Sequence, residues 1–525
     1  MRTKHLVILL IILALTLPAS PAQAAGVVSV CDESHLKTAL TGGGTVTFSC
    51  SGTITLTTSI IISANTTIDG SGQAVTISGN NAVRVFVVSQ GVNLELDGLT
   101  IANGKSQGGY GGGIFHDGNT LVVNKCTFSG NRADAGGAGI YNLVGQVTVN
   151  NSIFSANSSS QFGGAISNER TLTVNNTTFS GNSAGFVGGA IYNNGSMSVS
   201  NSTFYGNSAG TNGGGAIFST DMATVSSSTF SGNTSSGNGG GIYHSGSLTV
   251  SNSTFSGNHA GNFGGAIAVD ETLTIVNSTI SGNSASSAGG GIMDFYGPVL
   301  MQNTIVANNT AGGNCAGFIT DGGGNLSYPD KSCPGVNANP LLGPLQNNGG
   351  PTQTMALGTG SSAINAAVDA ICAASPVNNR DQRGAIRPYG AHCDIGAVEQ
   401  GALALPTPIS IDIKPGSDPN SINCGNANGV IAVAILTTGT FDATTVDHRT
   451  VTFAGAGETH VDKKTGEARR HAEDVDGDGD MDLVFHFRLG DTSLTCASTE
   501  AALQGETFAG QPITGADYVR MVGGS

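Results

Sequence analysis

The sequence predicts an all-β protein whose main body is a right-handed parallel β-helix with three strands in each coil of about 25 residues. The first observation is an isoleucine that ends a glycine-rich phrase at steps of 25 or 26 residues, at Ile114, Ile140, Ile166, Ile191, Ile217, Ile242, Ile267 and Ile292. The second is an apolar column with the same period, at Phe128, Phe154, Phe179, Phe204, Phe230, Phe255, Ile280 and Ile305. The third is a short alternating segment in most repeats, such as Leu172-Thr-Val174 and Leu248-Thr-Val250.

Three short strands separated by Gly, Asn and Ser leave no room for a helix in each repeat. Stacked coils pair as parallel strands about 4.8 Å apart, so the apolar columns become ladders inside the coil. The 80 glycines could also indicate disorder, but the regular apolar positions argue for a packed core. Leucine-rich and helical solenoids are the alternative repeat architectures, and the chain has neither the LxxLxLxxN pattern nor a helical period.

An asparagine recurs three residues after the second column, at Asn131, Asn157, Asn182, Asn207, Asn233, Asn258, Asn283 and Asn308. An aligned amide can donate a hydrogen bond to its copy in the next coil, as in stacked asparagine ladders. The repeated phrase is therefore interpreted first as a code for stacking.

The first residues indicate export. Arg2 and Lys4 precede an apolar run over 6–17, and Ala22-Gln-Ala24 is a cleavage signature, so residues 1–24 are predicted to be a signal peptide. A membrane anchor is the alternative, although the apolar run is too short to span a bilayer. No later segment is apolar enough to cross a membrane, so we expect a secreted or cell-envelope protein without a transmembrane segment after cleavage.

Less regular coils are expected before residue 110, and a short amphipathic helix over 31–40 is expected to cap them. Asp32 is a plausible N-cap, and Leu36 and Leu40 lie on one face of that helix. A cap would cover the unpaired strand edges that an open β-helix end exposes.

Nine cysteines without a CxxC motif argue against zinc or redox sites and, in an exported chain, favour disulfides. Sequence proximity suggests the pairs Cys31–Cys50, Cys315–Cys333, Cys372–Cys393 and Cys424–Cys496, although sequence alone does not fix connectivity. Cys126 remains, inside a repeat, as an expected buried thiol.

The alternating phrases FSGN and GGAI resemble the FxxN and GG[AL][ILVY] repeats of the chlamydial polymorphic outer membrane proteins, over roughly residues 110–310. Those proteins are surface-exposed adhesins with a β-helical passenger, so the resemblance implies a cell-surface or outer-membrane β-helix with a role in adhesion. Residues 347–399, with NNGGPTQTMAL, DQRG and CDIGAVE, look like the choice-of-anchor module of bacterial surface proteins. IDIKPGSDPNSIN (411–423) resembles a recurrent C-terminal module of secreted bacterial proteins.

These features divide the chain into six parts. They are a signal peptide (1–24), an N-terminal cap with irregular coils (25–110), regular repeats (111–345), a C-terminal cap (346–401), a linker (402–408) and a β-sandwich-like domain (409–525). From residue 401 onward lie 17 of the 35 acidic residues, which suggests that the last domain is a separate acidic module.

The segment DVDGDGDMD (474–482) predicts a structural calcium site in that module. Its expected ligands are Asp474, Asp476, Asp478, Asp480 through its carbonyl, and Asp482. Alternating hard oxygen donors suit a hard cation, and Gly479 supplies the turn. Phe485 stands where an EF-hand has its glutamate, and a strand follows, so the loop resembles the calcium loops of secreted β modules. A solvated acidic turn is the alternative.

The residue after each repeated isoleucine is expected to point outward and is often aromatic, at Phe115, Tyr141, Tyr192, Phe218 and Tyr243. Such a stripe could stack on sugar rings or form a structural ladder between coils. A second candidate column of carboxylates and one histidine lies on four successive coils, at Asp221, His244, Asp270 and Asp294. Neighbours about 4.8 Å apart could serve glycoside chemistry or hold calcium, or could be ordinary polar corner residues.

Two functions are compatible with this sequence. The first is a non-catalytic surface or secreted β-helix that binds a glycan or another surface partner. The second is a pectinase-like polysaccharide hydrolase or lyase, which uses the same fold. The repeats between residues 110 and 310 contain only three basic residues, Lys125, Arg132 and Arg170, which disfavours a lyase base. The net charge of −15 argues against nucleic acid as a partner.

Overall fold

A computed structural model describes residues 26–402, 406–417, 419–438, 441–461, 468–469, 471–477, 479–508 and 511–523. The expected signal peptide and its cleavage site lie outside these ranges, as does Asp478 of the expected calcium loop. Within the described ranges, no helix has both the length and the apolar character needed to cross a membrane.

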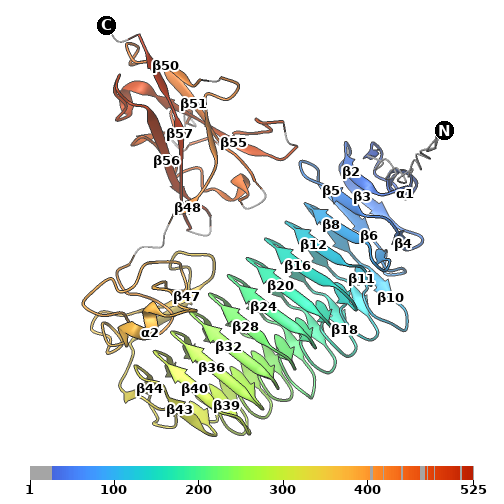
Figure 1. Cartoon of the computed structure of the whole chain (residues 1–525), viewed down its shortest axis with the longest axis vertical. Coiled ribbons are helices and arrows are strands. Elements are labelled where there is room, and N and C mark those ends of the chain that lie inside the picture. Colours follow the sequence, from blue (N-terminus) through green and yellow to red (C-terminus); the bar gives the residue numbers. More distant parts are fainter. Residues whose placement is uncertain are drawn as a thin grey trace, which may run out of the picture.

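The body of the protein is a solenoid of about 11 turns built from parallel sheets (Figure 1). Sheet A runs from β1 (Gly26–Val28) to β43 (Ile319–Asp321), sheet B from β3 (Gly52–Thr55) to β45 (Val336–Asn337), and sheet C from β4 (Ile60–Ile62) to β42 (Cys315–Ala316). The parallel pairing and the β-helix expected from the sequence are confirmed.

One regular coil consists of β23 (Ile191–Asn193), β24 (Ser196–Ser200), β25 (Thr203–Tyr205) and β26 (Ser208–Ala209). The first three are the expected strands and belong to sheets C, A and B. The fourth belongs to an additional eight-stranded sheet, sheet D, which runs from β10 (Lys105–Ser106) to β38 (Ser284–Ala285). Strands of two residues carry no readable alternation, which is why the sequence did not predict this sheet.

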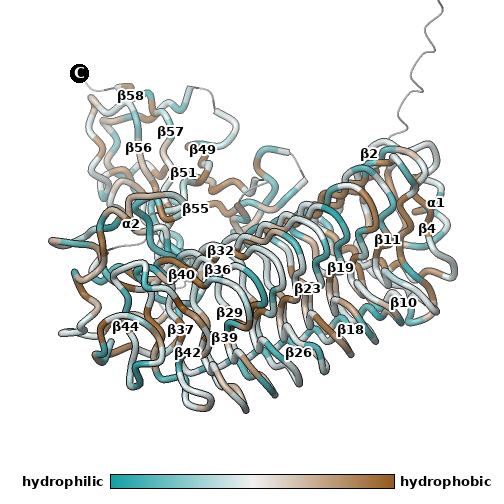
Figure 2. Tube along the Cα trace, turned by 60° about the horizontal axis from the view of Figure 1, so that its bottom comes forward, coloured by the Kyte–Doolittle hydropathy of each residue, from teal (hydrophilic) through white to brown (hydrophobic). Residues whose placement is uncertain are grey.

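The repeated apolar columns fill the interior of the coils. All eight isoleucines of the first column are at most 1% exposed, and the phenylalanines of the second column are fully buried. Phe179, Phe204 and Phe230 stack with ring centroids 4.8 and 4.6 Å apart. Hydrophobic segments therefore recur from coil to coil along the solenoid (Figure 2).

The asparagine column also points inward and forms the expected hydrogen-bonded ladder. Asn182 Nδ2 donates to Asn207 Oδ1 at 3.0 Å, and Asn207 Nδ2 donates to Asn233 Oδ1 at 2.9 Å. Each amide also donates to a backbone carbonyl, for example Asn207 to Phe179 at 3.0 Å. The ladder thus pairs buried backbone groups at a corner where the sheet pattern is interrupted.

Both columns differ from the sequence-based alignment in the last regular coil. The residue that pairs with Ile280 is Val306, not Ile305, and the amide that follows Asn283 in the ladder is Asn309, not Asn308. The cause is one extra residue in the turn between β39 (Ile292–Asp294) and β40 (Val299–Gln302), since Leu273 pairs with Val299, 26 positions later. A shift of one residue reverses the face on which each side chain lies.

Corner residues explain the repeated Asn and Gly of the phrase. Asn201, between β24 and β25, has φ of 49°, in the left-handed region that asparagine tolerates better than most residues. Gly188 has φ of 67°, and a Cβ there would lie 2.3 Å from the carbonyl oxygen of Ile191. Only glycine fits this second corner.

The expected N-terminal helix is α1 (Glu33–Ala39), which is close to β1 at the N-terminal end of the solenoid. The Asp32 carboxylate accepts a hydrogen bond from the amide of His35 at 2.9 Å, as an N-cap should. Leu36 is fully buried and Leu40 is half-buried against the solenoid core.

After the last coils, residues 346–402 form a lateral module with little regular structure. It contains β47 (Thr354–Leu357), paired with β46 (Leu342–Gln346), and α2 (Asp369–Ala373). The module packs on the outer side of sheet B, where the Gln382 side chain bonds to Thr229 and Thr254 at 2.9 and 2.6 Å. These threonines are buried here, whereas the equivalent Thr203 one coil earlier is only half-buried.

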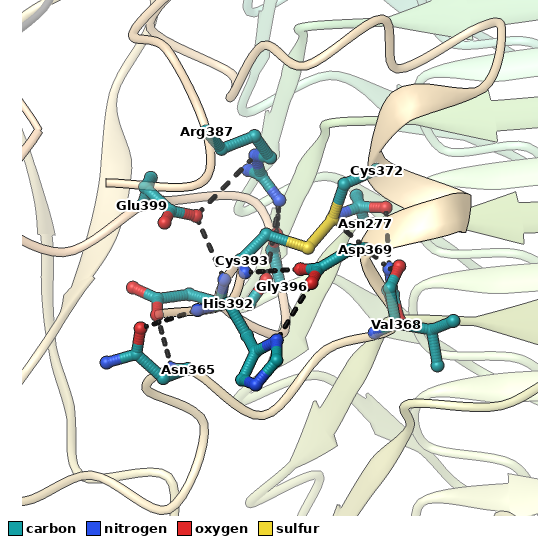
Figure 3. The surroundings of a disulfide bond; sticks show 12 residues. Asn277, Asn365, Val368, Asp369, Cys372, Arg387, His392, Cys393, Gly396 and Glu399 are labelled. Atoms are coloured by element: carbon teal, nitrogen blue, oxygen red, sulfur yellow. Dashed lines mark hydrogen bonds and ion pairs between the residues drawn. A yellow bond between two sulfur atoms is a disulfide. The ribbon is translucent and has the colours of Figure 1, made fainter. Parts of the chain in front are cut away.

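The lateral module is fastened by the disulfide Cys372–Cys393 (Figure 3). His392 Nδ1 lies 2.8 Å from Asp369 beside this bond. The fully buried Arg387 donates to the carbonyls of Asp394 and Gly396 at 3.4 and 3.2 Å. Buried charges need such partners, so this polar network helps to hold the module. Apolar contacts act beside it, since Leu357, Ala363 and Ile395 form a buried cluster with residues of the last coils.

All four cysteine pairs suggested by sequence proximity are disulfides in the structure. Their Cα–Cα distances are 5.7 Å for Cys31–Cys50, 5.1 Å for Cys315–Cys333, 6.8 Å for Cys372–Cys393 and 5.3 Å for Cys424–Cys496. Cys126 is the expected buried free thiol, and burial raises its pKa to about 12.

The C-terminal residues form a separate β domain of two main sheets. One sheet contains β48 (Thr407–Pro408), β57 (Pro512–Tyr518), β56 (Glu500–Glu506), β52 (Thr452–Phe453) and β53 (Ala456–Gly457). The other contains β49 (Ile411–Ile413), β51 (Val430–Ile435), β55 (Asp482–Arg488) and β54 (His471–Glu473). Apolar side chains of both sheets form one core, and β50 (Ser421–Asn423) pairs with β58 (Arg520–Val522) beside them.

Candidate binding face and metal loop

The aromatic stripe lies on the outer face of sheet C, in register between coils. Phe115 pairs with Tyr141, and Tyr192, Phe218 and Tyr243 pair in sequence further along. Ser167 interrupts the row between Tyr141 and Tyr192, because its coil carries no aromatic residue at this position.

Stacking between coils leaves these rings partly covered. Tyr192 and Phe218 are parallel with centroids 5.8 Å apart, and Phe218 meets Tyr243 edge-on at 5.3 Å. Tyr141 is only 7% exposed because Tyr110 stacks on it at 4.2 Å, while the other four rings are half-buried. The stripe is thus both a structural ladder and a partly accessible apolar face.

Several aromatic side chains outside the predicted set extend this face. Tyr110 and Phe162 come from the corner before the isoleucine phrase and pack on Tyr141 and Tyr192, at 4.2 and 5.1 Å. At the N-terminal end, the Arg84 guanidinium lies 5.1 Å from the centroid of Phe115, in a cation–π contact. The corner positions vary between repeats, so the period alone did not select them.

The four residues of the expected carboxylate and histidine column do not form one column. His244 and Asp294 occupy the same inward-facing register position two coils apart, with Val269 between them. Asp270 follows that position by one residue and Asp221 by two, so both lie in turns. The sequence alignment by coil was correct, but the side chains point in different directions because strand neighbours alternate faces.

The inward position is instead part of a second polar ladder, which sequence reasoning missed. His116 Nδ1 lies 2.8 Å from Asn142 Oδ1, and Asn142 and Asn168 each donate an amide hydrogen bond to the next coil at 2.6 Å. Its signal was the polar residue that recurs two places after most of the repeated isoleucines. His244 continues the position, and burial lowers its pKa to about 4.

Asp270 belongs to the outer face, where it meets the aromatic ladder. The Tyr243 hydroxyl donates to the Asp270 carboxylate at 3.0 Å, from one coil to the next. Burial, followed by the charge of Asp270, raises the pKa of Tyr243 to about 12. Burial also raises the pKa of Asp270. Asp294 has a local role, since it accepts hydrogen bonds from the amides of Gly297 and Phe318 at 3.1 and 3.0 Å.

The aspartate loop lies between β54 and β55 of the C-terminal domain. One carboxylate oxygen from each of Asp474, Asp476 and Asp482 lies within 4.8 Å of the other two, close enough to share a metal ion. Asp474 and Asp476 are exposed, whereas Asp482 is fully buried and accepts from the amides of Thr437 and Val475 at 2.7 and 2.9 Å. The buried carboxylate is therefore fixed in position, and the exposed ones open to solvent.

The remaining loop positions are turned elsewhere or lie outside the described ranges. Asp480 lies 3.8 Å from Lys125 of the solenoid, so its carboxylate is turned toward that lysine. Gly479 has φ of 98°, in the left-handed region that its expected role in the turn requires, and Gly477 has φ of 77°. Burial and the nearby Asp517 and Asp476 carboxylates raise the pKa of Asp412, which indicates how concentrated the negative charge is here.

Comparison with known proteins identifies the repeats. A family model of the Chlamydia polymorphic membrane protein repeat matches five segments, residues 125–143, 176–194, 201–220, 227–245 and 252–270. All five lie in the regular coils. Each segment contains one strand of sheet B and the following strand of sheet C. No curated protein and no solved structure matches the chain. The repeats and the parallel β-helix together fit a surface-exposed β-helix protein.

Proposed function

We propose that this protein is an exported, surface-exposed β-helix that binds an extracellular glycan along sheet C and does not catalyse a reaction on it. The observation that carries the proposal is the aromatic ladder Phe115, Tyr141, Tyr192, Phe218 and Tyr243, repeated at the coil spacing, in which every ring except that of Tyr141 is only half-buried. Contiguous apolar surface on a soluble chain commonly marks an interaction site. Rings stacked in a row present successive flat faces and edges to an extended polymer.

The carboxylates support binding over catalysis. A glycosidase needs two carboxyl groups about 5 to 9.5 Å apart on either side of the scissile bond. The candidate carboxylates of sheet C are instead divided between turns and the coil interior, and Asp294 is fixed by backbone amides. Among the described residues, the acidic side chains that lie close enough to share a metal ion are Asp474, Asp476 and Asp482, which belong to the C-terminal domain and not to sheet C.

A glycan array tests this function on the mature chain, residues 25–525, with both binding and cleavage recorded. We expect retention of a subset of glycans without shortened products. The double variant Tyr192→Ala/Phe218→Ala should weaken binding about tenfold or more, as expected for adjacent anchors of an interface. Tyr205→Ala is the matched control, because Tyr205 is an exposed aromatic residue on sheet B.

Three results would contradict the proposal. Equal affinity of the double variant and the parent would exclude the ladder as the binding face. Release of shortened glycans would support the hydrolase or lyase alternative. Binding of a protein ligand with no glycan retained would assign adhesion to a different partner. Thermal melting of each variant establishes that the solenoid remains folded.

We further propose that the aspartate loop binds calcium as a structural ion, with Asp474, Asp476, Asp478 and Asp482 as carboxylate ligands and Asp480 contributing its carbonyl. The support is the convergence of three of these carboxylates and the fixed, buried position of Asp482. Oxygen ligands at alternate loop positions suit a hard cation such as Ca²⁺. Without a cation, the neighbouring negative charges repel one another.

Calorimetry of the full mature chain tests the calcium proposal. The unfolding transition of the C-terminal domain should move to higher temperature in calcium than in EDTA, by a stabilisation of about 2.7 kcal/mol at 100 times the dissociation constant. Asp474→Asn should remove most of that difference, whereas Asp491→Asn, an exposed aspartate of the same domain, should keep it. Identical midpoints in calcium and EDTA would show that the loop is only an acidic turn.

A further inference from the structure

Three histidines gather on one side of the C-terminal domain, outside the aspartate loop. His471 lies on β54 and His486 on the neighbouring β55. His460 belongs to an adjacent extended segment, which is held to β55 by the amide of Thr459 donating to the carbonyl of His486 at 2.8 Å. The three residues are separated by 11 and 15 positions, so no sequence motif joins them.

Strand pairing explains why the rings meet. His471 pairs with Val484, so it shares a face with Val484 and, two residues further along β55, with His486. The other face of β55 carries Leu483, Phe485 and Phe487, which are buried in the domain core. His471 and His486 therefore lie on the outer face of the sheet, at the diagonal spacing where side chains of adjacent strands touch.

The imidazole rings are close to one another. His460 Nδ1 and His471 Nε2 are 2.7 Å apart, and their ring centroids are 4.6 Å apart. The His486 centroid lies 6.2 Å from that of His460 and 5.9 Å from that of His471. The Glu458 carboxylate fixes two of the backbones, since it accepts from the amides of His460 and His486 at 2.6 and 2.7 Å.

One ring nitrogen in this cluster lacks a partner. Nδ1 of His486 is buried and makes no hydrogen bond. A buried polar nitrogen without a partner is costly, and a native structure usually explains such an atom by an ion or a water. Two neighbouring rings that offer nitrogen lone pairs make a metal ion the explanation with the most suitable chemistry.

We propose that His460, His471 and His486 form a second metal site, which binds a divalent late first-row ion such as Zn²⁺ or Cu²⁺ through three imidazole nitrogens. Imidazole is a preferred ligand of these ions, whereas Ca²⁺ prefers oxygen. A zinc–nitrogen bond of about 2.0 Å places each ring centroid about 3.2 Å from the metal, so tetrahedral ligands have centroids about 5 Å apart. The three observed distances between ring centroids, 4.6, 5.9 and 6.2 Å, lie on both sides of this value of about 5 Å.

The rings must turn to converge on one ion. Among the described side chains, only the aspartate group already has ligand atoms within 4.8 Å of one another. His460 is exposed, and His471 and His486 are half-buried, so rotation about their side-chain bonds is the motion that brings the nitrogens together. Exposure of His460 also leaves a coordination position open to solvent or to a ligand group.

The new site is distinct from the aspartate loop although the two share a strand. His471 begins β54 and Asp474 follows three residues later, a separation of about 10 Å along an extended strand. The domain would thus hold a nitrogen site and an oxygen site beside each other. The acidic character of the chain, with a net charge of −15, favours cations at both.

Titration calorimetry of the full mature chain with Zn²⁺, and separately with Cu²⁺, tests the proposal in buffer that contains saturating Ca²⁺. We expect one ion bound per chain at this site. His460→Ala and His471→Ala should each weaken binding about tenfold or more, as expected when one of three ligands is lost. His259→Ala, an exposed histidine of the solenoid, is the matched control and should leave affinity unchanged.

A spectroscopic readout identifies the ligands directly. Imidazole ¹H–¹⁵N spectra of the parent should show three histidines shifted by Zn²⁺. In the His460→Ala/His471→Ala double variant, the remaining His486 signals should stay in place when Zn²⁺ is added. His460 is exposed, so its removal tests the site even if a substitution of His486 unfolds the domain.

The proposal is overturned by either of two results. The first is the absence of Zn²⁺ and Cu²⁺ binding to the folded chain. The second is binding that survives loss of the histidines but disappears in Asp474→Asn, which would assign the ion to the aspartate loop.

Discussion

Single polar side chains carry much of the order of the solenoid, because each one joins three coils. Asn207 is fully buried, accepts from Asn182 and donates to Asn233 and to the Phe179 carbonyl. The side chain has no exposed surface, so these bonds lie inside the coil. The fold therefore requires an asparagine at each ladder position, because its buried hydrogen bonds pair groups that would otherwise be unsatisfied.

Asn207→Ala should lower the free energy of unfolding of the solenoid by about 2 to 5 kcal/mol. The substitution removes the buried hydrogen bonds that Asn207 makes to the Phe179 carbonyl and to the backbone and side-chain amides of Asn182. Urea denaturation measures the change. Asn194→Ala, an exposed asparagine of the same coil that bonds to Glu169, should change stability by no more than about 0.5 kcal/mol. Equal losses in both variants would show that the ladder has no special role.

Asp97 makes the stability of the solenoid depend on pH. Burial, together with the nearby carboxylates of Asp69 and Glu95, raises its pKa to about 6 even though Lys125 opposes the shift. The folded state therefore binds more protons than the unfolded state between about pH 4 and 6, and stability falls as the pH rises through that window. The destabilisation caused by the buried, ionised Asp97 carboxylate is complete above about pH 6 and absent below about pH 4.

Asp97→Asn should therefore stabilise the solenoid at pH 7 and have little effect at pH 4. The amide has the shape of the carboxylate without its buried charge, so the gain is confined to pH values where Asp97 is ionised. Urea denaturation at the two pH values measures the difference. Asp134→Asn, an exposed aspartate of the next coil, is the control. A gain of the same size at both pH values would contradict the raised pKa.

At the scale of the element, each sheet of the solenoid is a stack of short strands that are similar in sequence. A strand of three residues, such as β25, has little stability alone and depends on the coils above and below. The phenylalanine stack inside sheet B supplies the contact, with neighbouring rings nearly parallel at 4.6 to 5.0 Å. The aromatic ladder on sheet C also stacks rings of neighbouring coils, but on the outer face, where the rings stay partly accessible.

Phe204→Ala should cost about 3 to 5 kcal/mol of stability, because it opens a cavity and breaks two ring contacts at once. The neighbouring Tyr205→Ala should cost far less, since Tyr205 is on the same strand but points outward and is 60% exposed. Denaturation of the two variants compares opposite faces of one strand. Similar losses would mean that the strand is not oriented as described.

At the scale of the whole molecule, the lateral module covers the side of sheet B over several coils. It uses outward threonines that most repeats carry at this position, and Gln382 joins Thr229 to Thr254. The main-chain amide of Ala397 donates to Thr279 at 3.0 Å one coil further on. Sheet C, on another side of the coil, is not used by these contacts.

The double variant Cys372→Ser/Cys393→Ser should loosen this module. The disulfide closes a loop of 21 residues, and its loss should cost about 3 kcal/mol in that region. Hydrogen exchange should become faster over residues 350–399 and stay unchanged over 111–220. Cys31→Ser/Cys50→Ser, at the opposite end of the solenoid, is the matched control and should leave 350–399 protected. Unchanged exchange in both would show that the polar network alone holds the module.

The sequence alone determined the parts of this protein in which contacts follow the repeat. In a solenoid the neighbour in space is the residue about 25 positions later, so the isoleucine, phenylalanine and asparagine ladders could be derived from the period. The same reason explains the small errors at Ile305 and Asn308, where one extra turn residue shifted the register. The cysteine pairs were also predictable, because three of the four close short loops.

Only the tertiary structure decided what depends on direction and on contacts without a period. The column that contained His244 and Asp270 divided between the interior and the turns, because adjacent strand residues face opposite ways. The hydrogen bond from Gln382 to Thr229 joins two residues that are 153 positions apart in the sequence. The three histidines meet through antiparallel pairing of β54 and β55, whose register is set by packing of the domain core, and no spacing in the sequence encodes that register.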